Sequence, residues 1–273
     1  MLRTRFNPLG RKPRSFTRWA ITHGAGVLDI RIVNVPNLLW TFPDSSTSTA
    51  ERPQKTVTAG TTVITSSNFA GPATQLIFYP STALASTPIK IADIPNFTVY
   101  LNWQPGSDYA VGTAAAFPRV STTLYIGSNV PISGSIRDLP RVNYNLYLIS
   151  NNNSMVGTPA EIPKVSNVLY LNAIPGLTGS VAALWTNISG ELRVTNCGVT
   201  GILPIHPSNT IISYHSNPNT SPTNYDQTIA NCVAAGASGA GHALHISSRR
   251  TSASDANKAT LISRGWTVTD SYQ

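Results

Sequence analysis

The sequence of 273 residues contains few charged side chains, few cysteines and no long apolar run. Charged residues make up 11% of the chain, less than half of the roughly 25% found in an average soluble domain. Ser, Thr, Asn, Gly and Pro take their place, and this composition favours short strands and turns over a helical bundle. The two cysteines, Cys197 and Cys232, are too few for a disulfide framework, and we expect both to be reduced.

The signals of a membrane protein or a secreted protein are also missing. No apolar stretch approaches the roughly 18 residues of a membrane span. The charged N-terminal residues are not followed by the apolar core of a secretory signal. We therefore expect no insertion into a membrane.

The motifs of common enzymes and metal sites are absent as well. HExxH, CxxC, GxSxG, Walker A and GxGxxG do not occur. Asp138 and Glu161 are expected on loops, where they resemble solvated carboxylates more than a glycosidase pair. His242 and His245 are three residues apart in an expected strand, so they point to opposite faces and do not indicate a metal site. The sequence predicts a protein that is not an enzyme, without catalytic residues, metal ligands or a cofactor.

The positive charge is concentrated at the N-terminus. The formal charge is +8, and residues 1–18 contain no acidic residue, whereas the rest of the chain is close to neutral. The basic residues of this arm are Arg3, Arg5, Arg11, Lys12, Arg14 and Arg18. Such an arm either docks on an anionic surface, which is nucleic acid or an acidic protein face, or stays a solvated tail. We interpret residues 1–70 as an attachment region that begins with this arm.

The middle of the chain is built from a repeat of 22 to 23 residues. Short apolar triplets mark it at Val99-Tyr100-Leu101, Leu124-Tyr125-Ile126, Leu146-Tyr147-Leu148, Leu169-Tyr170-Leu171 and Leu192-Arg193-Val194. A column of glycines follows them in nearly constant phase, at Gly112, Gly134, Gly157, Gly179 and Gly201. Side chains alternate between the two faces of a strand. The first and third positions of each triplet are therefore expected to face inward and to form one continuous apolar column as the repeats stack.

A polar position recurs five residues after each triplet begins. It is occupied by Asn129, Asn151, Cys197 and Asn217, and an inward amide there is expected to bond the backbone of the turn. The pattern resembles the leucine-rich repeat, L-x-x-L-x-L-x-x-N/C-x-L. "GLTGSV" at 176–181 and "GVTGILP" at 198–204 are similar to the plant-type subclass of that repeat. The resemblance covers roughly residues 70–250 and implies a solenoid with a parallel sheet.

The C-terminal part is expected to cap this solenoid. We predict helices at 225–236, where Ile229, Cys232 and Val233 share a face, and at 254–264, followed by a last strand. The match "A…LISRGWTV" resembles the end of leucine-rich-repeat proteins of tailed bacteriophages. Its residues are Ala259, Leu261, Arg264, Gly265, Trp266, Thr267 and Val268. The resemblance implies a virion protein, such as a tail fibre or tail-associated protein.

The middle residues of the triplets are the candidate binding residues. Tyr100, Tyr125, Tyr147, Tyr170 and Arg193 are expected to point outward at the strand spacing, as a ladder on the exposed sheet. Tyrosine combines a large apolar face with a hydroxyl group, which suits a sugar ring or a protein partner. The alternative is that stacked tyrosines only stabilise the sheet.

Taken together, we predict a mainly β protein with an attachment region (1–70), a leucine-rich-repeat-like solenoid (71–224) and a C-terminal cap (225–273). The expected function is that of a structural protein of a tailed bacteriophage virion, assembled in the host cytoplasm, that recognises the host surface. The expected partners are other virion proteins, further copies of the chain, and a glycan or protein of the host surface. A capsid decoration protein anchored by the basic arm, and a bacterial leucine-rich-repeat adhesin, remain alternatives.

Overall fold

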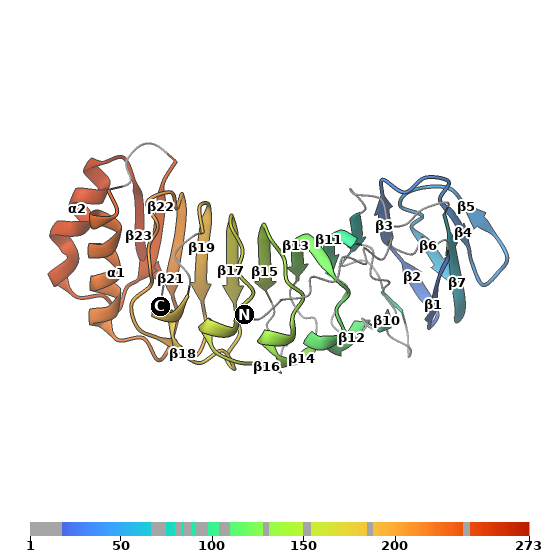
Figure 1. Cartoon of the computed structure of the whole chain (residues 1–273), viewed down its shortest axis with the longest axis horizontal. Helices are drawn as coiled ribbons and strands as arrows, with labels where there is room; N and C mark the ends of the chain where they lie inside the picture. Colours follow the sequence, from blue (N-terminus) through green and yellow to red (C-terminus); the bar gives the residue numbers. More distant parts are fainter. Residues whose placement is uncertain are drawn as a thin grey trace, which may run out of the picture.

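The computed structural model describes residues 18–66, 75–79, 83–84, 89–90, 98–103, 110–127, 131–149, 154–184, 188–236 and 241–272. The chain forms an elongated, mainly β molecule, in which strands lie side by side along the long axis and two helices lie at the C-terminal end (Figure 1). The prediction of a mainly β fold with a parallel sheet and short helices near the C-terminus is confirmed.

A ten-stranded sheet runs through most of the molecule. In spatial order its strands are β3 (Ile30–Val33), β8 (Gln75–Phe78), β11 (Thr98–Trp103), β13 (Val120–Ile126), β15 (Asn145–Ile149), β17 (Val168–Asn172), β19 (Glu191–Thr195), β21 (Ile211–His215), β22 (Ala243–Ser247) and β23 (Thr267–Tyr272). Strand β3 pairs with β8 in the antiparallel sense, and every later pair is parallel.

The register of these strands stacks equivalent residues of successive repeats. Leu124, Leu146, Leu169 and Leu192 are consecutive partners, as are Ile126, Leu148, Leu171 and Val194. All eight side chains are buried, whereas the residue between them in each strand is only half-buried. A single repeat cannot bury its own apolar face, so stacking supplies the core that each strand lacks.

One predicted alignment is wrong. Leu101 pairs with Leu124, and Asn102 pairs with Tyr125, so the triplet of this repeat is Leu101-Asn102-Trp103. Tyr100 instead lies opposite Thr123. Both possible triplets of β11 alternate correctly, and backbone pairing decides between them.

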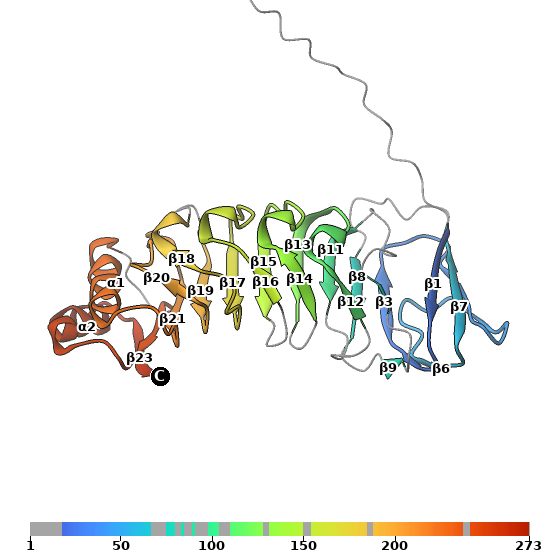
Figure 2. The ribbon, with the colours of Figure 1, turned by 90° about the horizontal axis from the view of Figure 1, so that it is seen from below.

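The long strands from β8 to β19 are each followed by a short strand, and in four repeats a 3-10 helix follows the short strand. The short strands are β10 (Ile89–Lys90), β12 (Ala110–Thr113), β14 (Ile132–Ser135) and β16 (Ser154–Val156) in one parallel sheet, and β18 (Gly179–Ser180) with β20 (Val199–Thr200) in another. The 3-10 helices are η2 (Ala114–Ala116), η3 (Ile136–Asp138), η4 (Pro159–Glu161) and η5 (Val181–Ala183), and each begins with a buried residue. Figure 2 shows these segments in the same order as the long strands.

The glycine column has a conformational reason. Gly134, Gly179 and Gly201 have φ angles of 100°, 97° and 90°, a region that other residues enter at a cost. At Gly201 a Cβ atom would also lie 2.6 Å from the Ser180 hydroxyl oxygen of the preceding repeat. These three glycines therefore allow the left-handed turn, and at Gly201 the absence of a side chain also allows the close approach of the preceding repeat.

The polar column contains an inward amide, as expected. Asn217 is fully buried, and its side chain accepts a hydrogen bond from the Cys197 backbone N–H and donates one to the Val194 carbonyl. Cys197 and, one repeat earlier, Ile174 are buried apolar occupants of the same column. Burial raises the pKa of the Cys197 thiol to about 12, so this cysteine packs as a small apolar residue. Asn129 and Asn151 lie outside the described residues.

The N-terminal part forms two further antiparallel sheets. One contains β1 (Arg18–His23), β7 (Gly60–Thr65), β4 (Leu39–Thr41) and β5 (Thr47–Ser48), and the other contains β6 (Lys55–Val57), β2 (Gly26–Leu28) and β9 (Ala83–Leu84). Because β3 pairs with β8, this region is continuous with the ten-stranded sheet. The stretch before and after Pro36 forms three strands, β2, β3 and β4, and residues 55–65 form two, β6 and β7.

The basic arm is only partly within the described residues. Arg18 is the first residue of β1, is exposed, and pairs with Thr65. Arg3, Arg5, Arg11, Lys12 and Arg14 lie outside the described residues.

The C-terminal cap contains two helices. Helix α1 (Pro222–Ala234) begins three residues before the predicted start, because the Ser221 hydroxyl caps it by accepting a bond from the Asn224 N–H. Its buried face contains Ile229 and Cys232, as expected, together with Tyr225. Helix α2 (Asp255–Ser263) follows the 3-10 helix η6 (Ser252–Ser254), and β23 closes the sheet. Figure 1 places both helices at the C-terminal end of the row of strands.

Candidate binding face on the parallel sheet

The tyrosine ladder is present on the outer face of the sheet. The Tyr125 and Tyr147 rings are 5.2 Å apart between centroids, and the Tyr147 and Tyr170 rings are 6.5 Å apart with an edge-to-face geometry. The Arg193 guanidinium continues the row, with its central carbon 5.1 Å from the centre of the Tyr170 ring. These residues are direct partners in β13, β15, β17 and β19. Tyr100 is the exception, because Asn102 occupies the equivalent position beside Tyr125.

The ladder stabilises the sheet as well as shaping its surface. Aromatic pairs of this geometry contribute roughly 0.5–1.5 kcal/mol beyond the area that they bury. A row of polar side chains runs beside it. The Asn145 side-chain amide donates to the Thr123 hydroxyl, and the Asn167 side-chain amide donates to Oδ1 of Asn145. The outer face therefore presents a row of aromatic rings beside a row of amides.

Beyond Tyr170 the face becomes hollow and polar. A pocket of about 260 Å³ lies there on strands β17 to β22. It is lined by Tyr170, Asn172, Arg193, Thr195, Ser213, His215 and His245. The register explains this arrangement, since Arg193, Ser213 and His245 are direct partners in neighbouring strands, and so are Thr195 and His215.

Three basic side chains meet in this pocket. Arg193 comes from β19, His215 from β21 and His245 from β22. Burial, and then the charge of His245, lower the pKa of His215 to about 4. Burial, and then the charge of Arg193, lower the pKa of His245. Both imidazoles are therefore neutral at pH 7, and Arg193 carries the positive charge.

Glu191 holds Arg193 in place. Oε2 of Glu191 accepts a hydrogen bond from Nε of Arg193 at a distance of 3.0 Å and forms an ion pair with Nη2 of Arg193, also at 3.0 Å. Side-chain exposure is 28% for Arg193 and 30% for Glu191, so the pair is reachable from solvent. The guanidinium is thus fixed beside the Tyr170 ring.

The ladder was predictable from the sequence, whereas the pocket was not. His215, His245, Ser213, Thr195 and Asn172 were not expected to meet Arg193. The signal was present in part, because "LHI" at 244–246 is a repeat triplet whose middle residue is His245. Extending the row of middle residues past Arg193 would have placed Ser213 and His245 on the same face.

A larger hollow lies on the loop side of the repeats, away from the ladder. Its volume is about 520 Å³, and its charged lining residues are Arg137, Arg141, Glu161 and Lys164. Glu161 is committed to a capping box, in which its carboxylate accepts the Thr158 N–H. None of the described residues that line this hollow is aromatic, so it lacks the aromatic surface of the sheet face.

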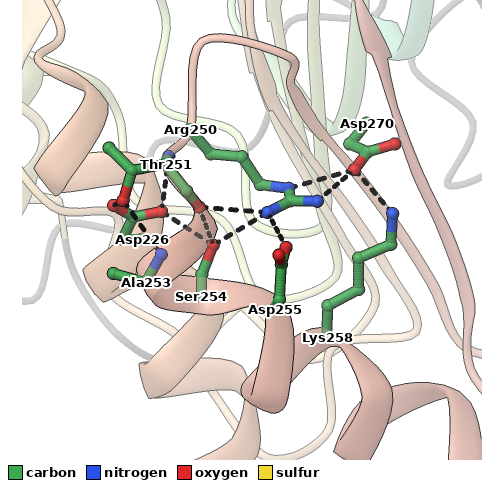
Figure 3. Close-up of polar contacts among 8 residues, drawn as sticks. All are labelled: Asp226, Arg250, Thr251, Ala253, Ser254, Asp255, Lys258 and Asp270. Carbon is green, nitrogen blue, oxygen red and sulfur yellow. Dashed lines mark hydrogen bonds and ion pairs between the residues drawn. The ribbon is translucent and has the colours of Figure 1, made fainter.

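The cap contains the densest cluster of charges among the described residues (Figure 3). Arg250 donates hydrogen bonds to Asp255 and Asp270, and Lys258 donates one to Asp270 at a distance of 2.5 Å. Asp226 accepts bonds from Thr251 and Ser254. These contacts tie α1, η6, α2 and β23 together, so the cluster explains how the cap is held on the sheet.

Within the described part of the chain, no group of three or more His, Cys, Asp or Glu residues is arranged to hold a metal ion. None of the described helices is long and apolar enough to cross a membrane. Comparisons with protein families, curated proteins and solved structures found no match to this chain. The candidate site therefore stands on its own geometry.

Proposed function

We propose that residues 71–224 form a leucine-rich-repeat-like solenoid and that residues 225–273 cap it. Three features support this architecture. The long strands stack in register at intervals of 22 to 23 residues, their buried Leu, Ile and Val residues form continuous columns, and Asn217 and Cys197 occupy the polar column of the repeat.

We propose further that the protein is a structural component of a tailed-bacteriophage virion, placed at the tail, and that its outer sheet face contacts the host surface. The carrying observation is the row of half-buried tyrosines that ends in the polar pocket at Arg193. Rigid aromatic rings beside amide, hydroxyl and guanidinium groups give large contact area and directional hydrogen bonds at low entropic cost. The C-terminal "LISRGWTV" resemblance supports the virion setting.

A second candidate is a capsid decoration protein. The six basic residues within 1–18 favour it, because such an arm suits an acidic coat surface. On this alternative the tyrosine face would contact neighbouring subunits.

The position of the protein on the particle separates these two functions. Purified particles are labelled with an antibody against the chain and viewed by electron microscopy. Label at the tail or its fibres is the expected result, whereas label spread over the head would replace the proposal by the decoration function. Absence of label from every particle would overturn both.

The role of the ladder is tested by the triple variant Tyr125→Ser, Tyr147→Ser and Tyr170→Ser. The matched control is Tyr144→Ser, because Tyr144 is 52% exposed and precedes β15, outside the ladder. We expect the triple variant to fold and to lose adsorption to host cells, with the control unchanged. Normal adsorption of particles that carry the triple variant would return the ladder to a purely stabilising role.

A further inference from the structure

The pocket beside Tyr170 combines an aromatic surface, a positive charge and several hydrogen-bonding groups. A neutral ligand does not need the charge, and a simple ion does not need the aromatic surface. The pocket contains an aromatic ring, a fixed guanidinium, two imidazoles, and the hydroxyl and amide groups of Thr195 and Asn172. Its volume of about 260 Å³ is below the roughly 300–1,000 Å³ of pockets for drug-sized ligands. The size suits one ring-sized unit of a longer ligand.

The charge of the lining selects an anion. Arg193 is a cation held at the pocket wall by Glu191. Burial first, and neighbouring positive charge second, lower the pKa values of His215 and His245, so the two imidazoles add no further positive charge at pH 7. Arg193 uses Nε and Nη2 to hold Glu191, and among the described residues no hydrogen bond of its Nη1 is found. A carboxylate is the planar anion that a guanidinium binds best.

The remaining lining selects a sugar ring. Tyr170 offers one face of the pocket, and its ring is already packed against Arg193 and Tyr147. The Thr195 hydroxyl donates to Oδ1 of the Asn172 side chain at a distance of 2.9 Å, and this bond fixes the orientation of the Asn172 amide group. Donors and acceptors of this kind beside an aromatic face are suited to the hydroxyl groups and C–H face of a pyranose.

We propose that this pocket binds a carboxylate-bearing sugar unit of a surface glycan, with the carboxylate on Arg193 and the ring against Tyr170. The inference rests on the proposed function, since it names the substance that the outer face recognises. Glu191 limits the affinity, because its carboxylate competes with the ligand for the same guanidinium.

The test is an NMR titration of the full chain, in isotope-labelled form, with methyl glucuronide and methyl galacturonide. The matched neutral probes are methyl glucoside and methyl galactoside. A charged hydrogen bond contributes about 1.5–3 kcal/mol, so at least one uronide should bind about tenfold or more tightly than its neutral counterpart. Equal affinity for the acidic and neutral members of both pairs would overturn the proposal.

Three variants locate the carboxylate. Arg193→Gln should lower uronide affinity about tenfold or more, whereas Arg137→Gln, an exposed arginine on η3, should leave it unchanged. Glu191→Gln should raise uronide affinity without changing the neutral sugars. A gain in affinity cannot arise from misfolding, so Glu191→Gln still tests the placement of the carboxylate on Arg193 if Arg193→Gln proves unstable. Unchanged or lower uronide affinity in Glu191→Gln would contradict the placement on Arg193.

The outcomes separate this inference from the proposed function. Uronide binding in solution together with absence from the virion would keep the inference and remove the virion role. Loss of adsorption in the tyrosine triple variant without any uronide binding would keep the host-recognition role and remove the acidic sugar.

Discussion

The Asn217 side chain accepts a hydrogen bond over 2.9 Å from the backbone N–H of Cys197, which occupies the same position one repeat earlier. The same amide donates over 2.8 Å to the Val194 carbonyl at the end of β19. One side chain thus satisfies two backbone groups of its neighbour in an interior that water does not reach. The repeat is held together by polar bonds as well as by its leucine columns.

Replacement of Asn217 by alanine should therefore destabilise the protein strongly. The Cys197 N–H and the Val194 carbonyl would stay buried without this partner, at a cost of about 1–3 kcal/mol for each group. We expect the free energy of unfolding in urea to fall by about 2–6 kcal/mol. The control is Asn143→Ala, an exposed position where a change within about 0.5 kcal/mol is expected. A similar small loss in both variants would show that the hydrogen bonds of Asn217 do not contribute measurably to stability.

The leucine columns were predictable from the sequence because one physical rule generates them. Leu146, Leu169 and Leu192 recur at the repeat period, alternate with polar or aromatic residues, and cannot be buried by a single repeat. Stacking is the solution that removes all of them from water. The glycine column was visible at the same period, and three of its members, Gly134, Gly179 and Gly201, share a left-handed backbone conformation.

Register and long-range pairing were less accessible. "VYLNW" at 99–103 contains two overlapping triplets with the same alternation, and the tyrosine favoured the wrong one. Strand β3 pairs with β8, more than forty residues later in the chain, and neither strand carries a local signal for the other. Such choices depend on the total packing and not on any one segment.

The candidate site shows the same division. The ladder follows from alternation within each strand, so Tyr125, Tyr147 and Tyr170 could be placed on one face from the sequence. The pocket depends on the pairing of β21 with β22, which are separated in the chain by helix α1. His215 lines the pocket from the position directly after the buried Tyr214.

Gly201→Ala should destabilise the protein through both its backbone and its neighbour. Its φ angle is 90°, and a Cβ atom would lie 2.6 Å from the Ser180 hydroxyl oxygen. Gly236 provides the control, because its φ of 76° imposes the same kind of strain and, among the described residues, no atom outside its chain neighbours lies within 4 Å of the added Cβ atom. We expect Gly236→Ala to cost about 1–2 kcal/mol from backbone strain, and Gly201→Ala to cost more.

A double variant isolates the contact. Ser180→Ala combined with Gly201→Ala should recover the excess cost over Gly236→Ala, as measured by urea unfolding in a double-mutant cycle. Additive losses would show that the close approach to Ser180 contributes nothing.

The cap should loosen in strong acid. Hydrogen bonds from Lys258 and Arg250 lower the pKa of Asp270 from 3.8 to about 2. The folded state therefore binds fewer protons than the unfolded state in this range, and stability falls as the pH drops from about 4 to 2. Because the Asp270 side chain is 30% exposed, we expect the loss to be about 1–2 kcal/mol after solvent screening.

The variant Asp270→Asn checks this assignment. It should be less stable than the natural chain at pH 5 and should lose less stability between pH 4 and 2. Asp138→Asn is the control, because Asp138 is 45% exposed on η3 and its nearest basic atom, Nε of Arg137, is 3.8 Å away. An unchanged acid profile in Asp270→Asn would assign the loss to other carboxylates.

His215 should give a second, separate pH dependence. Burial, and then the charge of His245, lower its pKa from 6.5 to about 4. The groups around it on the sheet are His245 on β22 and, on β19, Arg193 with its partner Glu191. The unfolded chain takes up a proton near pH 6.5 and the folded chain does so only near pH 4, so stability decreases as the pH falls between these values.

The expected loss over this window is about 1–3 kcal/mol, because the ring is only half-buried and solvent screens part of the penalty. His215→Gln keeps a polar side chain without a titrating group and should reduce the slope between pH 6.5 and 4, leaving the share of His245, whose pKa is lowered in the same direction. His206→Gln is the control, because His206 lies in the turn before β21, outside the pocket.

A bound uronide should reduce the slope in the natural chain, since its negative charge raises the pKa of His215 and so favours the protonated folded state. A slope that is unchanged in His215→Gln would place the titrating group elsewhere.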